Sequence, residues 1–191
     1  MRSNRDRALD AAIDLLGTEG LRALTHARVD QRAALPRGST SNYFRTRAAL
    51  LQGVVDAMVA RESPAVNFAF APRTTTELVD ELCRLFDLMM GPNRVMTTAR
   101  MTLLVEAGHD PGLRTTLVGG RRALEALVLP ALARLGAPDP HAAFDTLTVC
   151  FEGLFMHRIA SHGDPDPRTV FDAVVRGTFH RDQGTTAVNL S

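Results

Sequence analysis

The chain contains no lysine and no tryptophan, and aromatic residues make up only 5% of its 191 residues. Its two cysteines, Cys83 and Cys150, lie far apart without paired spacing. This favours core packing over a disulfide framework or a redox site. No apolar run reaches the roughly 20 residues that a membrane span needs. We therefore expect a cytoplasmic protein that has no membrane partner.

Residue patterns that support catalysis are also missing. His109 and His157 have no second histidine or cysteine at metal-ligand spacing. The Gly17 to Gly20 segment has neither the preceding strand nor the lysine of a phosphate-binding loop. Ser39 and Ser41 have no neighbouring histidine that could complete a triad. We therefore expect no catalytic residues, no metal and no cofactor.

What the chain does have is apolar residues at helical spacing. Hydrophobic residues make up 45% of it, which is typical of a folded protein. The periodicity predicts an all-α fold. We expect helices at about 37–44, 46–63, 76–90, 95–107, 111–135, 140–161 and 168–180, after a first helix that Gly20 ends. The fourth helix should end before Pro64, and the pair Gly119-Gly120 and Pro130 should kink or interrupt the helix that starts at Pro111. The 95–107 helix is apolar nearly all round, which places it centrally.

Charge is distributed unevenly along the chain. Residues 1–47 hold nine arginines against five acidic residues, a net charge of +4. The remaining residues hold 13 arginines against 16 acidic residues, a net charge of −3. A positive end suits phosphate, because the planar guanidinium group matches oxyanions. A coding bias accounts for the absence of lysine better than DNA contact does, since the acidic part lacks lysine too.

Residues 25–44 read as two short helices joined by a tight turn. Thr25 can cap the first helix, on which Val29 and Ala33 share one inward face. Pro36 disfavours a helical conformation at Leu35 and suits the start of a new helix. The second helix carries almost no aliphatic side chains. It displays groups that hydrogen-bond to base edges and phosphates in a major groove, namely Arg37, Ser39, Thr40, Ser41, Asn42 and Tyr43.

At these residues the chain resembles the TetR family of transcriptional regulators. The resemblance covers about the first 60 residues. Upstream it includes Arg7, Leu9, Ala11, Ala12, Leu16, Glu19, Gly20 and Leu21, and downstream Phe44, Arg47, Leu50 and Leu51. The chain departs from the family pattern at Asp30, Ala34, Ser41 and Arg47, which replace a small residue, a glycine, a tyrosine and a lysine. The carboxylate of Asp30 must either reach solvent or find a partner such as Arg28 or Arg32.

The resemblance implies an amino-terminal three-helix, helix-turn-helix domain and a carboxy-terminal helical domain that binds an effector and dimerises. We place the DNA-binding domain at 1–47, a connecting helix at 48–62, the effector and dimerisation domain at 63–180, and a disordered tail at 181–191.

Site residues follow from the motif and the resemblance together. Expected base contacts are Arg37, Ser39, Thr40 and Asn42. Expected phosphate contacts are Thr25, Arg28, Tyr43, Thr46 and Arg47. The expected effector pocket is lined by Met58, Phe86, Met89, Met101, Leu104 and Arg121. The apolar members are by themselves more typical of plain core, and it is the family resemblance that favours a pocket. The expected dimer interface comprises Leu124, Val128, Phe144, Leu147, Phe151 and Leu154, with Phe151 and Leu154 at its centre.

These features predict a homodimeric repressor that binds a partly palindromic DNA operator and is released by a small apolar effector. Two alternatives remain open. An all-helical enzyme or adaptor could retain the motif without using it, and an activator would share the same DNA chemistry.

Overall fold

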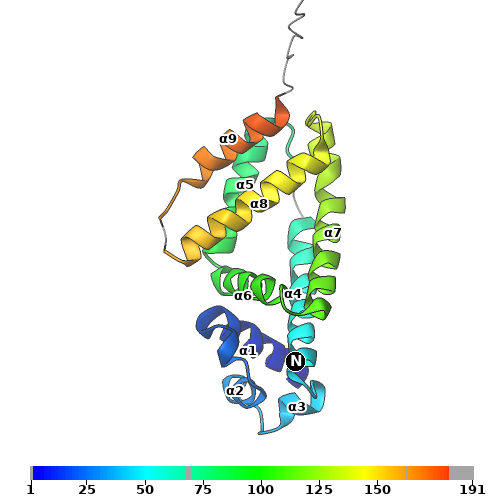
Figure 1. Ribbon diagram of the computed structural model, residues 1–191, viewed down its shortest axis with the longest axis vertical. Coiled ribbons are helices and arrows are strands. Elements are labelled where there is room, and N and C mark those ends of the chain that lie inside the picture. The colour runs from blue at the N-terminus through cyan, green and yellow to red at the C-terminus, as the bar shows by residue number, and fades with distance from the viewer. Residues whose placement is uncertain (1, 68–69, 162, 181–191) are drawn as a thin grey trace, which may run out of the picture.

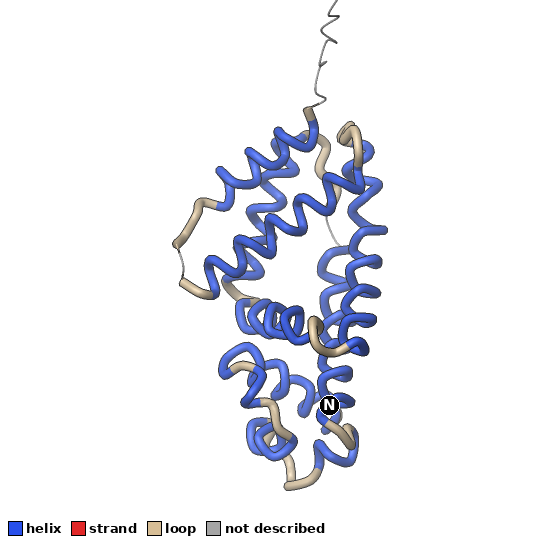
Figure 2. The backbone as a smooth tube through the Cα atoms, in the orientation of Figure 1, coloured by secondary structure: helices blue, strands red, loops and turns tan. Residues whose placement is uncertain are grey.

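The protein is described by a computed structural model that covers residues 2–67, 70–161 and 163–180. In these residues every regular element is a helix, and there is no strand (Figure 2). The predicted all-α fold is therefore confirmed. The tail expected at 181–191 lies outside the described residues.

The amino-terminal helices lie together at one end of the molecule (Figure 1). They are α1 (Asn4–Glu19), the short 3-10 helix η1 (Leu21–Ala23), α2 (His26–Arg32) and α3 (Ser39–Tyr43). Ser3 begins α1 with a capping box, since its Oγ accepts from the Asp6 amide at 3.1 Å and the Asp6 carboxylate accepts from the Ser3 amide at 3.3 Å. Gly20, at a φ of 79°, ends α1 as expected.

Two long helices connect this end to the rest of the molecule. The helix α4 (Arg47–Asn67) packs against α7 (Pro111–Arg134). The expectation that α4 ends before Pro64 is wrong, because the helix continues to Asn67. A proline removes one helical N–H and its ring crowds the carbonyl four residues earlier, which can kink a helix without ending it.

The helix α7 is likewise continuous through both glycines and through Pro130, so of the predicted kink or interruption, the interruption is wrong. A Cβ added at Gly120 would lie 3.1 Å from Cγ2 of Val59 in α4. Gly120 therefore permits a close approach between the two helices. Gly136 follows α7 at a φ of 86° and ends it as predicted.

The remaining helices are α5 (Thr75–Met90), α6 (Arg94–Glu106), α8 (Pro140–Ile159) and α9 (Pro167–Phe179). Of these, α5, α8 and α9 form the other end of the molecule, and α6 lies between them and the amino-terminal helices (Figure 1). The start of α5 is capped by Thr74, and Asp110, Asp139 and Asp166 cap α7, α8 and α9. A proline follows each of these three aspartates at the first helical position, which suits it because that N–H has no helical partner.

The buried side chains form two hydrophobic clusters. The first joins α1, α2, α4 and α6 and includes Leu16, Leu50 and Leu103. The second joins α5, α7, α8 and α9 around Phe86 and Phe171. Residues of α6 contribute to both clusters, so the predicted central position of this helix is confirmed, although it is not buried on every side.

The contact between α1 and α6 is unusually close at one point. Gly17 lies inside α1, and a Cβ added there would fall 2.1 Å from the carbonyl oxygen of Val95. No side chain fits in that space unless the backbone moves. The amino-terminal helices are therefore held against α6 by backbone contact as well as by buried side chains.

Candidate nucleic-acid interface

The helices α2 and α3 form the expected helix-turn-helix. Thr25 caps α2, because its Oγ1 accepts a hydrogen bond from the Arg28 amide at 3.3 Å. The turn passes through Ala34 at a φ of 51° and Gly38 at a φ of 89°. The second helix starts at Ser39 rather than near residue 37, because Gly38 takes the left-handed conformation just before it. Arg37 therefore lies in the turn, at the entrance to α3.

Asp30 holds the start of α3. Its side chain accepts three hydrogen bonds, from the Gly38 amide at 2.7 Å, the Thr40 amide at 2.8 Å and the Thr40 hydroxyl at 2.5 Å. The residue is only 4% exposed. Burial raises the pKa of Asp30, but the bonds from Thr40 and Gly38 outweigh burial and hold the pKa below its usual value. The expected choice between solvent and an arginine partner is thus wrong, since the buried carboxylate binds the turn instead.

Thr40 cannot contact a base in this arrangement. It is fully buried, and its hydroxyl hydrogen is donated to Asp30. The prediction that Thr40 reads the operator is therefore wrong. The polar character of the segment hid this role, because an internal hydrogen bond and a base contact call for the same kind of residue.

His26 has a role that the sequence did not indicate. Its Nε2 lies 2.6 Å from the carbonyl oxygen of Phe44, to which it donates, at the other end of α3. His26 and Asp30 are four residues apart on α2, so they share one face of that helix. Together they attach both ends of α3 to α2.

Most arginines of the amino-terminal domain are engaged within the protein. Arg28 and Arg32 pair with Glu19, and Arg32 also pairs with Asp14. Arg47 donates to the carbonyl oxygen of Leu21 at 3.2 Å. The two arginines expected to contact phosphate, Arg28 and Arg47, are thus both exposed, and both have a partner within the protein.

Three arginines differ from the others in this respect. Arg22, Arg37 and Arg45 are exposed and form no ion pair, hydrogen bond or ring contact with the described part of the chain, whereas Arg5, which also has no ion pair or hydrogen bond there, lies 5.4 Å from the centre of the Phe44 ring. Arg37 precedes α3 and Arg45 follows it, so the two arginines flank this helix. Sequence reasoning missed Arg45, for which the only signal was a basic residue directly after the polar helix.

The other predicted contacts are distributed over α3 and the helix starts. Asn42 is exposed, and Tyr43 is 47% exposed. Ser39 is half-buried and donates to the Pro36 carbonyl at 2.6 Å. The hydroxyl of Thr46 accepts from the Ala49 amide at 3.0 Å, so Thr46 begins α4. The exposed surface of this motif thus presents amide, hydroxyl and guanidinium groups, the chemistry that reads base edges and phosphates.

The six residues expected to line an effector pocket do not share one environment. Met58 belongs to the first cluster, whereas Phe86 and Met101 belong to the second. Met89 and Leu104 are partly buried against the second cluster. Arg121 lies at the junction of α7 and α8, where it pairs with Asp145 at 2.7 Å. Only four of the six therefore remain together.

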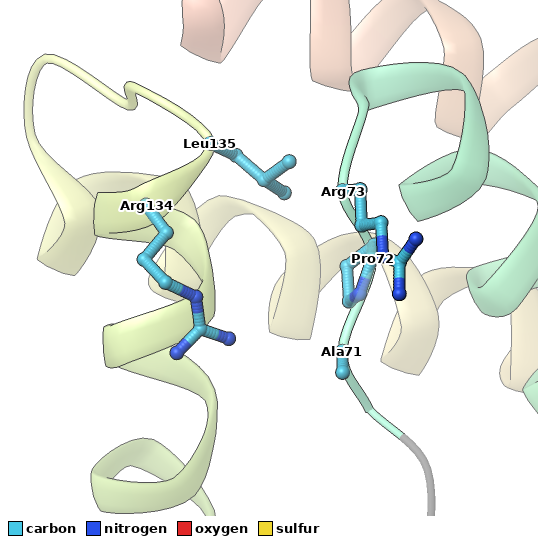
Figure 3. A pocket seen from close by; sticks show the side chains of 5 residues that line it. All are labelled: Ala71, Pro72, Arg73, Arg134 and Leu135. Carbon is cyan, nitrogen blue, oxygen red and sulfur yellow. The ribbon is translucent and has the colours of Figure 1, made fainter.

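Two pockets that the structure contains lie elsewhere. One, of about 330 Å³, is lined by Leu15, Arg28, Gln31 and Arg32. The other, of about 370 Å³, is lined by Ala71, Pro72, Arg73, Arg134 and Leu135. Figure 3 shows Arg134 and Leu135 extending from the end of α7 toward the segment that precedes α5. None of the predicted effector residues lines either pocket.

A half-buried charge, Arg100 of α6, lies within the electrostatic range of Glu152 of α8. Burial lowers the pKa of Arg100 to about 10, while the charge of Glu152 acts in the opposite direction. Arg100 therefore stays protonated at neutral pH. Thr97, one turn earlier, is buried, and its single hydroxyl hydrogen is shared between the carbonyl oxygens of Met89 and Asn93, which lie 2.8 and 3.1 Å from Oγ1. The interior of this domain thus carries polar groups that are already satisfied.

The predicted dimer interface requires correction. Phe144, Leu147 and Leu154 are at most 5% exposed and belong to the core of their own chain. The Phe151 ring packs on Phe155 and Phe171, at centroid distances of 5.5 and 4.6 Å. The sequence periodicity identified an apolar side of α8 correctly, but this side faces inward. Leu124 and Val128 are only partly buried, against the same cluster.

Catalytic or membrane features do not emerge from the described residues. Within them, no three His, Cys, Asp or Glu side chains are grouped so that they could hold a metal ion. None of the described helices combines the length and apolar character that crossing a membrane requires. Cys83 and Cys150 are free and half-buried, and burial raises the pKa of both thiols.

The described residues form helices only, with an exposed helix-turn-helix packed against a carboxy-terminal group of helices, an arrangement typical of helix-turn-helix transcriptional regulators. A family profile described as "Tetracyclin repressor-like, C-terminal domain" matches residues 73–181. The chain belongs to the TetR family of transcriptional regulators. No match was found among curated proteins.

Solved structures share the fold. A transcriptional regulator from Streptomyces coelicolor A3(2) is 22% identical with a TM-score of 0.70, and the match covers 94% of this chain and 100% of that one. A regulator from Rhodococcus sp. Rha1 is 16% identical with a TM-score of 0.80, covering 92% and 96%. The multidrug binding protein EbrR in complex with ethidium is 23% identical with a TM-score of 0.73, covering 91% and 98%.

Proposed function

We propose that this protein is a repressor that binds a partly palindromic operator as a homodimer and leaves it when a small apolar effector binds the carboxy-terminal domain. The observation that carries the DNA part is the pair of exposed arginines, Arg37 and Arg45, on either side of a short polar helix. In this proposal Arg37, Asn42 and Ser39 contact bases. Arg45, Arg47, Thr25, Thr46 and Tyr43 contact phosphates, and Arg28 joins them where its pair with Glu19 opens.

Selection of DNA from random duplexes tests this directly. We expect the protein to enrich a palindromic sequence, because a two-fold dimer presents the same helix twice. Footprinting on the DNA that flanks its own gene should then show protection of a related site. Failure to enrich any sequence, while the protein is folded and dimeric, would refute the proposed function.

The dimer face proposed here lies on the outer side of α7 and α8. These two helices are joined by the Arg121–Asp145 pair at 2.7 Å and by His141 with Glu125 at 2.9 Å. Next to this seam, α8 exposes one stripe at helical spacing without a charged residue: Ala142, Thr146, Val149, Gly153 and Met156. Val149 is 64% and Met156 44% exposed, and a Cβ added at Gly153 would meet no neighbouring atom.

We propose that a second copy of the chain covers this stripe in the dimer. The neighbouring edge of α7 adds Val118, which is 42% exposed, and Ala126. Two helices from each subunit would form a four-helix contact that buries this apolar face.

Val149→Asp should give folded monomers, because the side chain is exposed in the single chain and would be buried only in the dimer. Val105→Asp on α6 is the matched control, since Val105 is 67% exposed and lies on another face. Sedimentation would distinguish the two. Dimers for both variants would refute this face as the interface.

The effector site is proposed at Phe86, Met89, Met101 and Leu104 in the second cluster. Phe86 is 1% and Met101 8% exposed, so a ligand must separate side chains that now touch. EbrR forms a complex with ethidium, which makes a planar aromatic dye a suitable first probe.

Ethidium or a related compound should raise the melting temperature of this protein, because it binds the folded state only. Because ethidium also binds duplex DNA directly, its effect on operator binding is measured as the difference between wild type and Met101→Trp at one dye concentration. A compound that binds the same site but not DNA should weaken operator binding by the factor by which operator weakens its own binding. Met101→Trp should reduce the effect of the dye on the melting temperature and leave DNA binding without dye intact. Val105→Trp on the same helix should leave both unchanged. An unchanged dye response in a folded Met101→Trp protein would exclude this site.

A further inference from the structure

The contacts of α3 within the protein differ from those of an ordinary surface helix. This helix has only five residues. A helix that short has few internal hydrogen bonds and little intrinsic stability. Its orientation must therefore be set by bonds from other elements.

Those bonds come from one face of α2. At the start of α3, the Asp30 carboxylate accepts from the Gly38 amide at 2.7 Å and from the Thr40 amide at 2.8 Å. At the end of α3, His26 donates to the carbonyl oxygen of Phe44 at 2.6 Å. The first contact is buried and involves a charge, which makes it the stronger of the two.

The hydroxyl of Thr40 completes the arrangement. It donates to Oδ1 of Asp30 at 2.5 Å, and Thr40 is fully buried. Because a buried hydroxyl without a partner is costly, Thr40 and Asp30 each require the other. The bonds also specify direction, since each Asp30 oxygen has a fixed donor: Oδ2 takes Gly38 and Oδ1 takes Thr40.

We infer that Asp30 is a positioning residue for operator recognition, acting through Thr40 and Gly38 on the helix that enters the groove. Asp30 touches no DNA in this role. It fixes the angle at which Asn42 and the flanking Arg37 meet the bases, and thereby sets specificity rather than general DNA affinity. The inference rests on the proposed DNA-binding function.

The distinction between specific and non-specific binding follows from the charges. Non-specific affinity comes from arginines near phosphate, which Asp30 does not engage. Specific affinity needs base contacts within a narrow geometry. Loss of the Asp30 bonds should therefore reduce the ratio of operator affinity to non-specific affinity, while the salt dependence of non-specific binding stays the same.

Asp30→Asn tests this in the full-length protein. The probe is the duplex that the wild-type protein enriches from random DNA, measured beside a scrambled duplex. We expect operator affinity to fall by about tenfold to a hundredfold, the range for lost hydrogen bonds to a charged group. Asp56→Asn removes the same charge from an exposed position on α4 and should leave the ratio unchanged.

Thr40→Val and Thr40→Ser isolate one bond of the set. The valine variant keeps the shape and loses the donor, so the ratio should fall by roughly threefold to tenfold. The serine variant keeps the hydroxyl and should remain within about twofold of wild type. The double variant Asp30→Asn, Thr40→Val should bind no worse than Asp30→Asn alone, because both changes break the same contact.

These measurements decide whether Asp30 positions α3 for operator recognition. A folded Asp30→Asn protein with an unchanged ratio would overturn the inference. Should Asp30→Asn lose its helical signal by circular dichroism, Thr40→Val decides, and an unchanged ratio in that variant would overturn it too. Additive losses in the double variant would also contradict it. A wild-type protein that enriches no duplex would instead refute the proposed function itself.

Discussion

Gly17→Ala tests the close contact between α1 and α6. In an exposed helix this change stabilises a protein by about 0.5–1 kcal/mol, because glycine loses more backbone entropy on folding. At Gly17 the new Cβ would lie 2.1 Å from the Val95 carbonyl oxygen, 2.7 Å from its Cγ1 and 2.8 Å from its carbonyl carbon. Two of these three atoms belong to the backbone, which cannot rotate away as the end of a side chain can.

The expected magnitude follows from these two opposing effects. Forcing an extra carbon into a packed contact costs about 1–3 kcal/mol, which exceeds the helix gain of about 0.5–1 kcal/mol. The net effect is a loss of up to about 2.5 kcal/mol in the free energy of unfolding, toward the upper end because the clash is with backbone atoms.

Gly119→Ala provides the matched control. Gly119 also lies within a helix, but a Cβ added there would meet no atom within 4 Å. The free energy of unfolding of this variant should rise by about 0.5–1 kcal/mol. Urea denaturation at one protein concentration should therefore show changes of opposite sign. If Gly17→Ala were as stable as Gly119→Ala, the backbone contact with Val95 would not be as close as described.

Three further predictions concern the amino-terminal domain. Ala34→Gly should stabilise the protein by roughly 0.5–1.5 kcal/mol, because Ala34 holds a φ of 51° that glycine adopts without strain; a lower melting temperature would contradict this. The folded-state pKa of Asp30 is lowered, so its contribution to stability is complete above about pH 5 and is lost as the pH falls through that lowered value. The free energies of unfolding of wild type and Asp30→Asn should accordingly differ at pH 7 and converge in acid. A difference that grows as the pH falls would mean that the folded-state pKa of Asp30 is raised and not lowered. Arg45→Ala should weaken binding to all DNA sequences alike and reduce the salt dependence of that binding by about one in slope. Arg84→Ala on α5 should change neither quantity, and gel-shift titrations at several salt concentrations measure both.

Helix content and the helix-turn-helix follow from the sequence alone. Apolar residues at helical spacing and the capping residue Thr25 are local signals, and local signals are sufficient to predict helices. The resemblance to the TetR family rests on residues in the first 60 positions, and the family profile that matches residues 73–181 then confirmed it independently.

Only the tertiary structure decided which polar groups remain available for DNA. Arg28 and Arg45 are both exposed, yet Arg28 pairs with Glu19, whereas Arg45 has no partner among the described residues. Thr40 and Asn42 are both polar, yet Thr40 binds the buried Asp30. Such pairs join positions that are 9 or 10 residues apart and lie on different helices.

The same limit explains the corrected dimer interface. The apolar side of α8 was identified from spacing, but periodicity says only that a face is apolar and not which neighbour covers it. Phe171 of α9 and Phe86 of α5 cover that side within one chain, as the ring contacts of Phe151 and Phe155 show. The weaker stripe around Val149 is what stays exposed, because the folded chain has no further helix with which to cover it among the described residues.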